Sequence, residues 1–209
     1  MDNTVVLLGT VPVTARASVG TKDLLVQLRP VLRAERDRAR ALAQQEPWST
    51  DGLSRREAAA RRTRWEEHKA QLRRQGALFD SLDALVAGGL YQELESRGWN
   101  RQWPALPRQA RGRLPGSPQG QWPEKIAIRL PADLVHTARS ACWHACSKEI
   151  NLLYDWRDRH PKALPTRASR SRCDAEALAE YKQLASKVIT TGQIWRAAIH
   201  RGVTSAKAI

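Results

Sequence analysis

The sequence lacks the features of membrane and exported proteins. No apolar run approaches the roughly 18 to 20 residues needed to span a bilayer. The apolar stretch Val5–Leu8 is too short, and too poorly flanked by positive charge, for a signal-peptide core. The three cysteines (Cys142, Cys146 and Cys173) are an odd number, so a disulfide framework is not expected. We therefore expect a cytoplasmic protein with reduced thiols and no membrane contact.

The sequence also lacks the motifs of common catalytic sites. It contains no Gly-rich phosphate loop, no H-E-x-x-H pair and no G-x-S-x-G nucleophile elbow. The nearest arrangement to a metal site is Cys142-x-His144-x-Cys146, which Cys173 and His160 would have to complete. On a helix, however, residues 142 and 146 share a face while residue 144 points nearly opposite. We predict small buried residues here, with no metal, no cofactor and no enzymatic activity.

Acidic residues are scarce relative to basic ones. The chain has 35 Lys and Arg but only 21 Asp and Glu, which gives a formal net charge of +14. Residues 101–209 hold 19 of these bases and 8 of these acids, so most of the excess lies in the second half. Because such a surface attracts polyanions, we expect salt-sensitive binding to nucleic-acid phosphates. The alternatives are a basic protein whose charge serves only its solubility, and an acidic protein partner.

Three segments of the first half have the apolar spacing of helices. Two of them, at about 24–45 and 77–96, repeat apolar residues on one stripe. Between them, Ser54 and Glu57 form an S-x-x-E capping box that begins a polar, Arg-rich helix at about 54–74. These segments predict a small bundle or long antiparallel hairpins.

Two further local features belong to the same half. Val11, Val13 and Ala15 alternate in the manner of a frayed strand, and Pro30 marks either the first turn of a helix or a kink. We predict that residues 1–97 form an N-terminal helical domain with a surface for self-association.

Residues 98–123 are rich in proline, glycine and arginine and contain no acidic residue, which is typical of a linker or an extended arm. Three tryptophans, Trp99, Trp103 and Trp122, are unusual in a passive linker because exposed indoles tend to be hidden. We expect them either to fold back onto a domain or to stack on bases. In the second case they would act beside the arginines of the segment: Arg101, Arg108, Arg111 and Arg113.

The clearest local pattern lies at residues 125–130. Isoleucine or leucine at the even positions alternates with Lys125, Ala127 and Arg129 at the odd ones. A strand here therefore has one core face and one basic face. Asp133 follows at a position where it can cap a helix. A lone strand in a helical region leaves an edge that must pair with something.

The run from Ile126 to Val135, Ile-Ala-Ile-Arg-Leu-Pro-Ala-Asp-Leu-Val, resembles the opening of ribbon-helix-helix DNA-binding proteins. In that family the strand pairs with its twin in a dimer, and the two-stranded ribbon enters the major groove. The resemblance implies that Lys125, Ala127 and Arg129 face DNA, with Arg129 in contact with guanine. It also implies a homodimer bound to double-stranded DNA.

A second part of the resemblance lies at residues 190–203, which open with Thr190-Thr191-Gly192. This segment is similar to the second helix of the family, whose amino end clamps a phosphate. The resemblance gives that role to Thr190, Thr191 and the Gly192 amide. The family joins its two helices by a tight turn, whereas residues 146–189 intervene here.

The intervening segment has the spacing of a helix over 148–159 and of another after Asp174. In an alternative register, Ser147 caps a second helix at 148–157 and closes the motif early, although the usual turn glycine is missing. The segment also adds positive charge to the predicted nucleic-acid surface, at Arg157, Arg159, Arg167, Arg170 and Arg172.

We expect a mainly α protein in three parts: an N-terminal helical domain (1–97), a linker (98–123) and a basic C-terminal strand–helix domain (124–209) that resembles ribbon-helix-helix proteins. The predicted function is that of an accessory or regulatory DNA-binding protein, such as a repressor or an auxiliary factor in plasmid maintenance or transfer. The alternative is a helical structural or adaptor subunit that binds RNA or an acidic protein in a larger assembly.

Overall fold

The computed structural model describes residues 9–107, 110, 122–161 and 175–208. This part of the chain is mainly helical, with a single two-stranded antiparallel sheet, and none of its helices is both long and apolar enough to cross a membrane. The strands are β1 (Thr10–Ala17) and β2 (Glu124–Pro131). The helices are α1 (Thr21–Gln27), α2 (Arg29–Ala43), α3 (Arg55–Gln75), α4 (Leu82–Ser96), α5 (Ala132–Ala145), α6 (Ser147–Arg159), α7 (Ala175–Ser186) and α8 (Thr191–Lys207).

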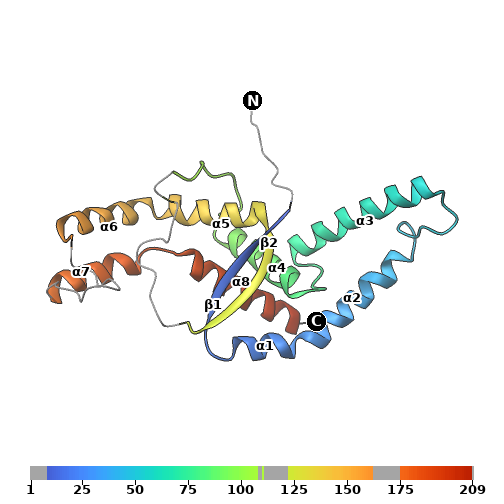
Figure 1. The fold of residues 1–209 in the computed structure, drawn as a ribbon, viewed down its shortest axis with the longest axis horizontal. Helices are drawn as coiled ribbons and strands as arrows, with labels where there is room; N and C mark the ends of the chain where they lie inside the picture. Colours follow the sequence, from blue (N-terminus) through green and yellow to red (C-terminus); the bar gives the residue numbers. More distant parts are fainter. Residues whose placement is uncertain (1–8, 108–109, 111–121, 162–174, 209) are drawn as a thin grey trace.

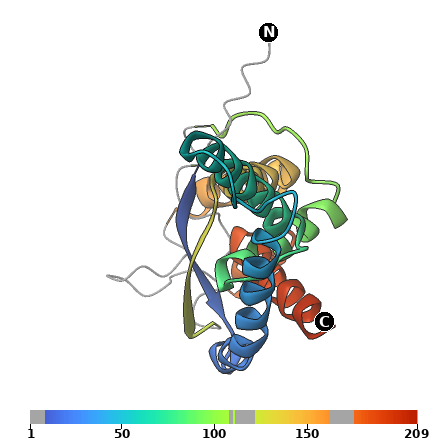
Figure 2. The same cartoon turned by 90° about the vertical axis from the view of Figure 1, so that its right-hand side faces the viewer.

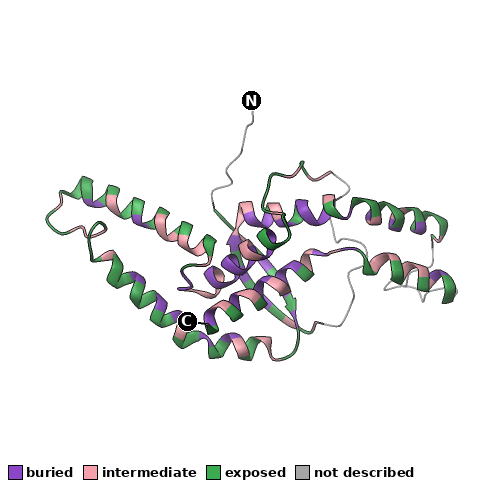
Figure 3. Ribbon diagram, turned by 180° about the vertical axis from the view of Figure 1, so that it is seen from behind, coloured by how far each residue is buried: buried purple, intermediate pink, exposed green. Residues whose placement is uncertain are grey.

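A central body carries a helical hairpin on each side (Figure 1). In the body, β1 and β2 form a ribbon that lies against α4 and α8, next to α5. The α2–α3 hairpin projects on one side and the α6–α7 pair on the other. Buried residues gather in the body, whereas exposed residues dominate both hairpins (Figure 3). The elements around the ribbon therefore form the framework of the molecule.

One hydrophobic core joins the two halves of the chain. It draws on β1, α1 and α4 from the first half and on β2, α5 and α8 from the second. The segments that the sequence assigns to separate N-terminal and C-terminal domains therefore share a core. The physical reason is that β1 has no strand partner within residues 1–97 and that α3 covers only part of α4, so the remaining apolar faces of β1 and α4 are buried against β2 and α8.

Glycines allow α4 and α8 to pack very closely where they cross. A Cβ atom at Gly202 would lie 2.5 Å from the carbonyl oxygen of Leu85, and one at Gly89 would overlap the carbonyl oxygen of Ala198. The two backbones thus approach more closely than larger side chains permit. This contact fixes the relative positions of the two helices behind the ribbon.

Most helix boundaries follow local signals. The predicted capping box at the start of α3 is confirmed, since Glu57 N donates to Ser54 Oγ (3.4 Å) and Ser54 N donates to Glu57 Oε2 (3.1 Å). Pro30 lies in the first turn of α2, so the segment predicted as one helix is divided into α1 and α2. The helix predicted from residue 77 begins at Leu82 because Ser81 caps it.

The prediction that Asp133 caps a helix is wrong. Helix α5 begins one residue earlier, after Pro131, without a side-chain cap, and Asp133 pairs instead with Arg74 of α3 at 2.9 Å. Helix α6 then begins at Ser147, one residue before the second helix that the alternative register predicts at 148–157. The two helices lie in a row in Figure 1, so α6 extends away from the ribbon. Helix α8, and not α6, packs behind β1.

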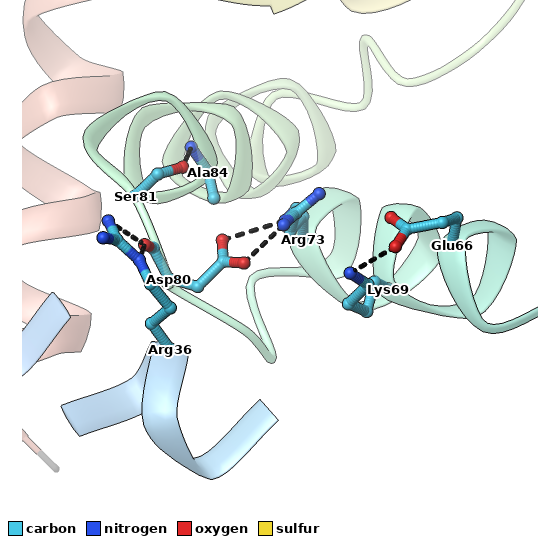
Figure 4. Close-up of polar contacts among 7 residues, drawn as sticks. All are labelled: Arg36, Glu66, Lys69, Arg73, Asp80, Ser81 and Ala84. Carbon is cyan, nitrogen blue, oxygen red and sulfur yellow. Dashed lines mark hydrogen bonds and ion pairs between the residues drawn. The ribbon is translucent and has the colours of Figure 1, made fainter. Parts of the chain in front are cut away.

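Asp80 holds the α2–α3 hairpin to the body (Figure 4). Arg73 Nε donates to one carboxylate oxygen of Asp80 at 2.9 Å, and its Nη2 donates to the other. Arg36 Nη2 donates to the Asp80 carbonyl oxygen at 3.1 Å. Because the next residue, Ser81, caps α4, these bonds link the hairpin to a helix behind the ribbon.

Candidate nucleic-acid interface

The strand predicted at 125–130 forms, and its partner is β1 of the same chain. The antiparallel register places Arg16 opposite Lys125 and Pro12 opposite Arg129. The ribbon that the resemblance implies between two chains is thus built within one, because the alternating residues of Thr10–Ala17 supply a second strand with a matching apolar face. Both strands bury every second side chain against the helices.

The opposite face of the ribbon is exposed. In Figure 2 the ribbon lies at one edge of the body, with the helices on one side of it. Its outward side chains include three cations and no carboxylate, and two threonines add hydroxyl groups. These exposed residues are Thr10, Pro12, Thr14 and Arg16 on β1 and Lys125, Ala127 and Arg129 on β2.

Two of these cations lie directly across from each other. The Arg129 N–H points away from β1 and donates to Asp83 Oδ1 at 2.9 Å, so the cross-strand pair at Arg129 is a non-hydrogen-bonded one. Because the two types of pair alternate along the strands, the pairs at Ala127 and Lys125 are also non-hydrogen-bonded. Side chains are closest in such pairs. Arg16 and Lys125 form one of them, and like charges directly opposite destabilise a free sheet. A bound anion would relieve this repulsion.

The other end of the exposed face carries Arg129. Its Nε donates to Thr10 Oγ1 across the ribbon at 3.3 Å, so the side chain lies over the strands. Between the two charged ends, Ala127 lies opposite Thr14. Both side chains are shorter than those of the flanking cations, so they extend less far from the strands. The face therefore combines flanking cations with a shallow centre.

The predicted start of the last helix is confirmed at Thr190. Gln193 N donates to Thr190 Oγ1 (3.3 Å), and Thr190 N donates to Gln193 Oε1 (2.7 Å). Thr190 is buried, and its hydroxyl is engaged in this box, whereas Thr191 and Gly192 are half-buried. First-turn amides of a helix have no acceptor within the helix, so the backbone at Thr191 and Gly192 is better placed than the Thr190 hydroxyl to meet a phosphate.

The start of α8 lies near the end of the ribbon that carries Arg16 and Lys125. Arg196, one turn after Gly192, donates through Nη1 to the Arg16 carbonyl oxygen at 3.4 Å. Its guanidinium also stacks over the Trp122 ring at 4.0 Å. Of the ribbon residues to which the resemblance assigns DNA contacts, Lys125 thus lies at the end of the ribbon near α8, whereas Arg129 lies at the other end.

Other predicted contact residues lie elsewhere. Arg157 and Arg159 are exposed on the outer part of α6, away from the ribbon in Figure 1, and Arg159 pairs with Glu180 of α7 at 3.0 Å. Several further arginines lie outside the described residues: Arg108, Arg111, Arg113, Arg167, Arg170 and Arg172.

The tryptophans after α4 fold back onto the body. Trp99 packs against the main core, and Trp103 donates through Nε1 to the Trp99 carbonyl oxygen at 2.9 Å. The guanidinium of Arg101 covers the Trp103 ring at 4.3 Å. Of the two alternatives from the sequence, the structure has the folded-back arrangement.

The Cys142–His144–Cys146 cluster does not converge. Both cysteines are buried, whereas His144 stacks on Trp103 and contacts the Pro104 carbonyl oxygen at 3.0 Å. Burial, aided by the neighbouring Cys146, raises the pKa of Cys142 to about 12, so this thiol stays protonated at neutral pH. Within the described part of the chain, no group of three or more His, Cys, Asp or Glu side chains is placed to hold a metal ion. Cys173 lies outside it.

The sequence analysis missed the contribution of β1 to this surface. Thr14 and Arg16 belong to the exposed face, and the alternation of Val11, Val13 and Ala15 was the signal that places them there. Comparison of the chain with protein-family models, curated proteins and solved structures finds no match.

Proposed function

We propose that this protein binds double-stranded DNA by placing the β1–β2 ribbon in the major groove. The observation that carries the proposal is the exposed ribbon face, which has three cations, no carboxylate and a cross-strand pair of like charges. A two-stranded ribbon has dimensions that the major groove admits. Repulsion between Arg16 and Lys125 raises the free energy of the unbound protein, and a bound polyanion would reduce this repulsion.

The residues of this face have different roles in the proposal. Arg129 and Arg16, whose forked guanidinium groups match the O6 and N7 acceptors of guanine, read bases from opposite ends of the ribbon. Thr14 and Ala127 fit the low centre, where methyl groups can contact thymine. The amides of Thr191 and Gly192 position a phosphate beside the Arg16 end.

One chain supplies a whole ribbon, so a homodimer would carry two ribbons instead of sharing one. Each bound ribbon consists of two different strands, which favours a target without twofold symmetry for each chain. In this proposal the protein acts as an accessory or regulatory factor, such as a repressor or an auxiliary factor in plasmid maintenance or transfer.

The proposal is tested with single substitutions on the exposed face. Arg16→Ala, Lys125→Ala and Arg129→Ala should each weaken binding to a labelled duplex about tenfold, as measured by fluorescence anisotropy. The target comes from selection out of a random duplex pool. Arg129→Ala should also relax the base preference, whereas Lys125→Ala should mainly reduce the salt dependence.

A matched control is Arg56→Ala, which removes one exposed cation from α3 and should leave the affinity within about twofold. Because Arg16 and Lys125 repel each other, replacing either should leave the free energy of unfolding unchanged or slightly higher. Equal loss of affinity in Arg56→Ala and Arg129→Ala would reject the ribbon as the DNA-binding surface.

The α2–α3 hairpin favours a second candidate, an adaptor that binds RNA or an acidic protein. This hairpin projects from the body, and four of its exposed arginines form no ion pair with another described residue: Arg55, Arg56, Arg62 and Arg64. Under this alternative, the double substitution Arg56→Ala and Arg62→Ala abolishes binding while Arg129→Ala leaves it intact.

A further inference from the structure

A cavity of about 400 Å³ lies between the β1–α1 turn, α8 and Trp122. This volume falls in the range of small-molecule sites. Its apolar wall is formed by Leu24 of α1 with Ile199 and Val203 of α8. The apolar wall therefore suits an aliphatic chain.

The polar side of the cavity is dominated by Arg196. None of the described residues that line the cavity is acidic, and Arg196 forms no ion pair with another described residue. Burial lowers the pKa of Arg196, which indicates a cation that has lost part of its hydration without gaining a carboxylate. Such a group favours an anion within its reach.

Trp122 fixes the position of this cation. Its ring stacks under the guanidinium at 4.0 Å. Nη1 of this guanidinium donates to the Arg16 carbonyl oxygen, so a forked contact with an anion would use Nε and Nη2, which form no hydrogen bond with another described residue. The Trp122 Nε1 atom is itself buried and has no hydrogen-bond partner in the described part of the chain. Ser18 and Thr21, which also line the cavity, add two hydroxyl groups, which lie within hydrogen-bond distance of each other.

We propose that this cavity binds a small amphipathic carboxylate, whose charged group meets Arg196 and whose aliphatic chain packs against Leu24, Ile199 and Val203. A carboxylate matches the fork of a single guanidinium and carries one charge, as the one lining arginine requires. The cavity adjoins the Arg16 end of the ribbon, but none of its lining residues belongs to the exposed ribbon face, and the proposal does not depend on DNA binding.

The test uses octanoate and its neutral counterpart octanamide, titrated into the full-length protein by isothermal calorimetry. Octanoate should bind at least about tenfold more tightly than octanamide. Arg196→Gln should remove this difference, and Arg139→Gln, which deletes an exposed cation on α5, should preserve it. Leu24→Trp, which fills the cavity, should weaken both ligands.

A second readout uses the unchanged protein and does not require the variants to fold. The indole N–H signal of Trp122, identified by its loss in Trp122→Phe, should shift in the ¹H–¹⁵N spectrum when octanoate is added. Equal binding of octanoate and octanamide, equal effects of Arg196→Gln and Arg139→Gln, or an unmoved Trp122 signal at saturating octanoate would each overturn the proposal.

Discussion

Glu93 of α4 is a buried carboxylate that receives hydrogen bonds from two arginines. Arg97, the residue after the end of α4, donates through Nε at 2.6 Å, and Arg201 of α8 donates through Nε at 2.5 Å. Burial by itself raises the pKa of a carboxyl group, but the bonds from Arg201 and Arg97 outweigh burial and hold the pKa of Glu93 below its ordinary 4.5. The charged form of Glu93 therefore joins the two helices behind the ribbon.

Glu93→Gln should change the pH dependence of stability. The lowered pKa of the folded state stabilises the native protein above 4.5, and this stabilisation is lost as the pH falls through the folded value. Near neutral pH we expect the substitution to cost about 2 kcal/mol of unfolding free energy. As the pH falls through the lowered pKa of Glu93, the two proteins should converge in stability, as measured by urea unfolding. A gap of constant size across this range would contradict the assigned role.

The exposed side chains of β2 could be assigned from sequence, because alternation is a local property. Lys125, Ala127 and Arg129 are all exposed, as that alternation predicts. Arg16 could not be assigned in the same way, because its role depends on which strand pairs with β2. That pairing joins parts of the chain as distant as Thr10 and Pro131, and no local pattern specifies such a contact.

At the scale of elements, Asp80 determines how firmly the α2–α3 hairpin is held. Asp80→Asn removes the charge that binds Arg73, so we expect the stability to fall by about 2 kcal/mol. Amide hydrogen exchange should also become faster in α3, whose Arg73 loses its charged partner, and in α2, whose Arg36 is bonded to the carbonyl oxygen of the same residue. Exchange followed by mass spectrometry measures this effect for each helix.

Glu66→Gln provides the control for Asp80→Asn. Glu66 also forms an ion pair within the hairpin, with Lys69 at 2.7 Å, but its carboxylate is exposed (Figure 4). Surface pairs contribute little, so this substitution should change stability by less than about 0.5 kcal/mol and leave exchange in α2 unchanged. Equal effects of the two substitutions would show that Asp80 has no special part in holding the hairpin.

Elements with strong local signals were predictable, and their packing partners were not. The capping boxes of α3 and α8 and the alternation of β2 are contained within a few residues. The periodicity of α4 indicates that a face is buried but not against which helix. Its close contact with α8 depends on Gly89 and Gly202, which the chain brings together from opposite halves. A boundary between domains drawn from composition therefore crosses the core.

At the scale of the whole molecule, the decisive property is that one chain forms the ribbon. Thr14 lies opposite Ala127 in a non-hydrogen-bonded pair, where side chains are close enough for a disulfide. In the double variant Thr14→Cys and Ala127→Cys, oxidation should therefore join the two strands within one chain. A non-reducing gel should show a monomer, and mass spectrometry of its peptides should identify the bond.

The single substitution Thr14→Cys is the control, and the native Cys142 and Cys146 are buried. Dimers linked from residue 127 of one chain to residue 127 of another would show that β2 pairs with its twin. That outcome would restore the dimeric ribbon implied by the resemblance and reject the pairing seen here.

The pairing of β1 with β2 also determines the order in which the protein can fold. During synthesis β1 emerges first, yet it has no partner until Pro131 has been made, and α4 remains without α8 for longer still. Contacts between such distant parts of a chain form slowly. The apolar faces of β1 and α4 therefore stay uncovered through most of translation, and this interval is when the nascent chain is most prone to aggregate.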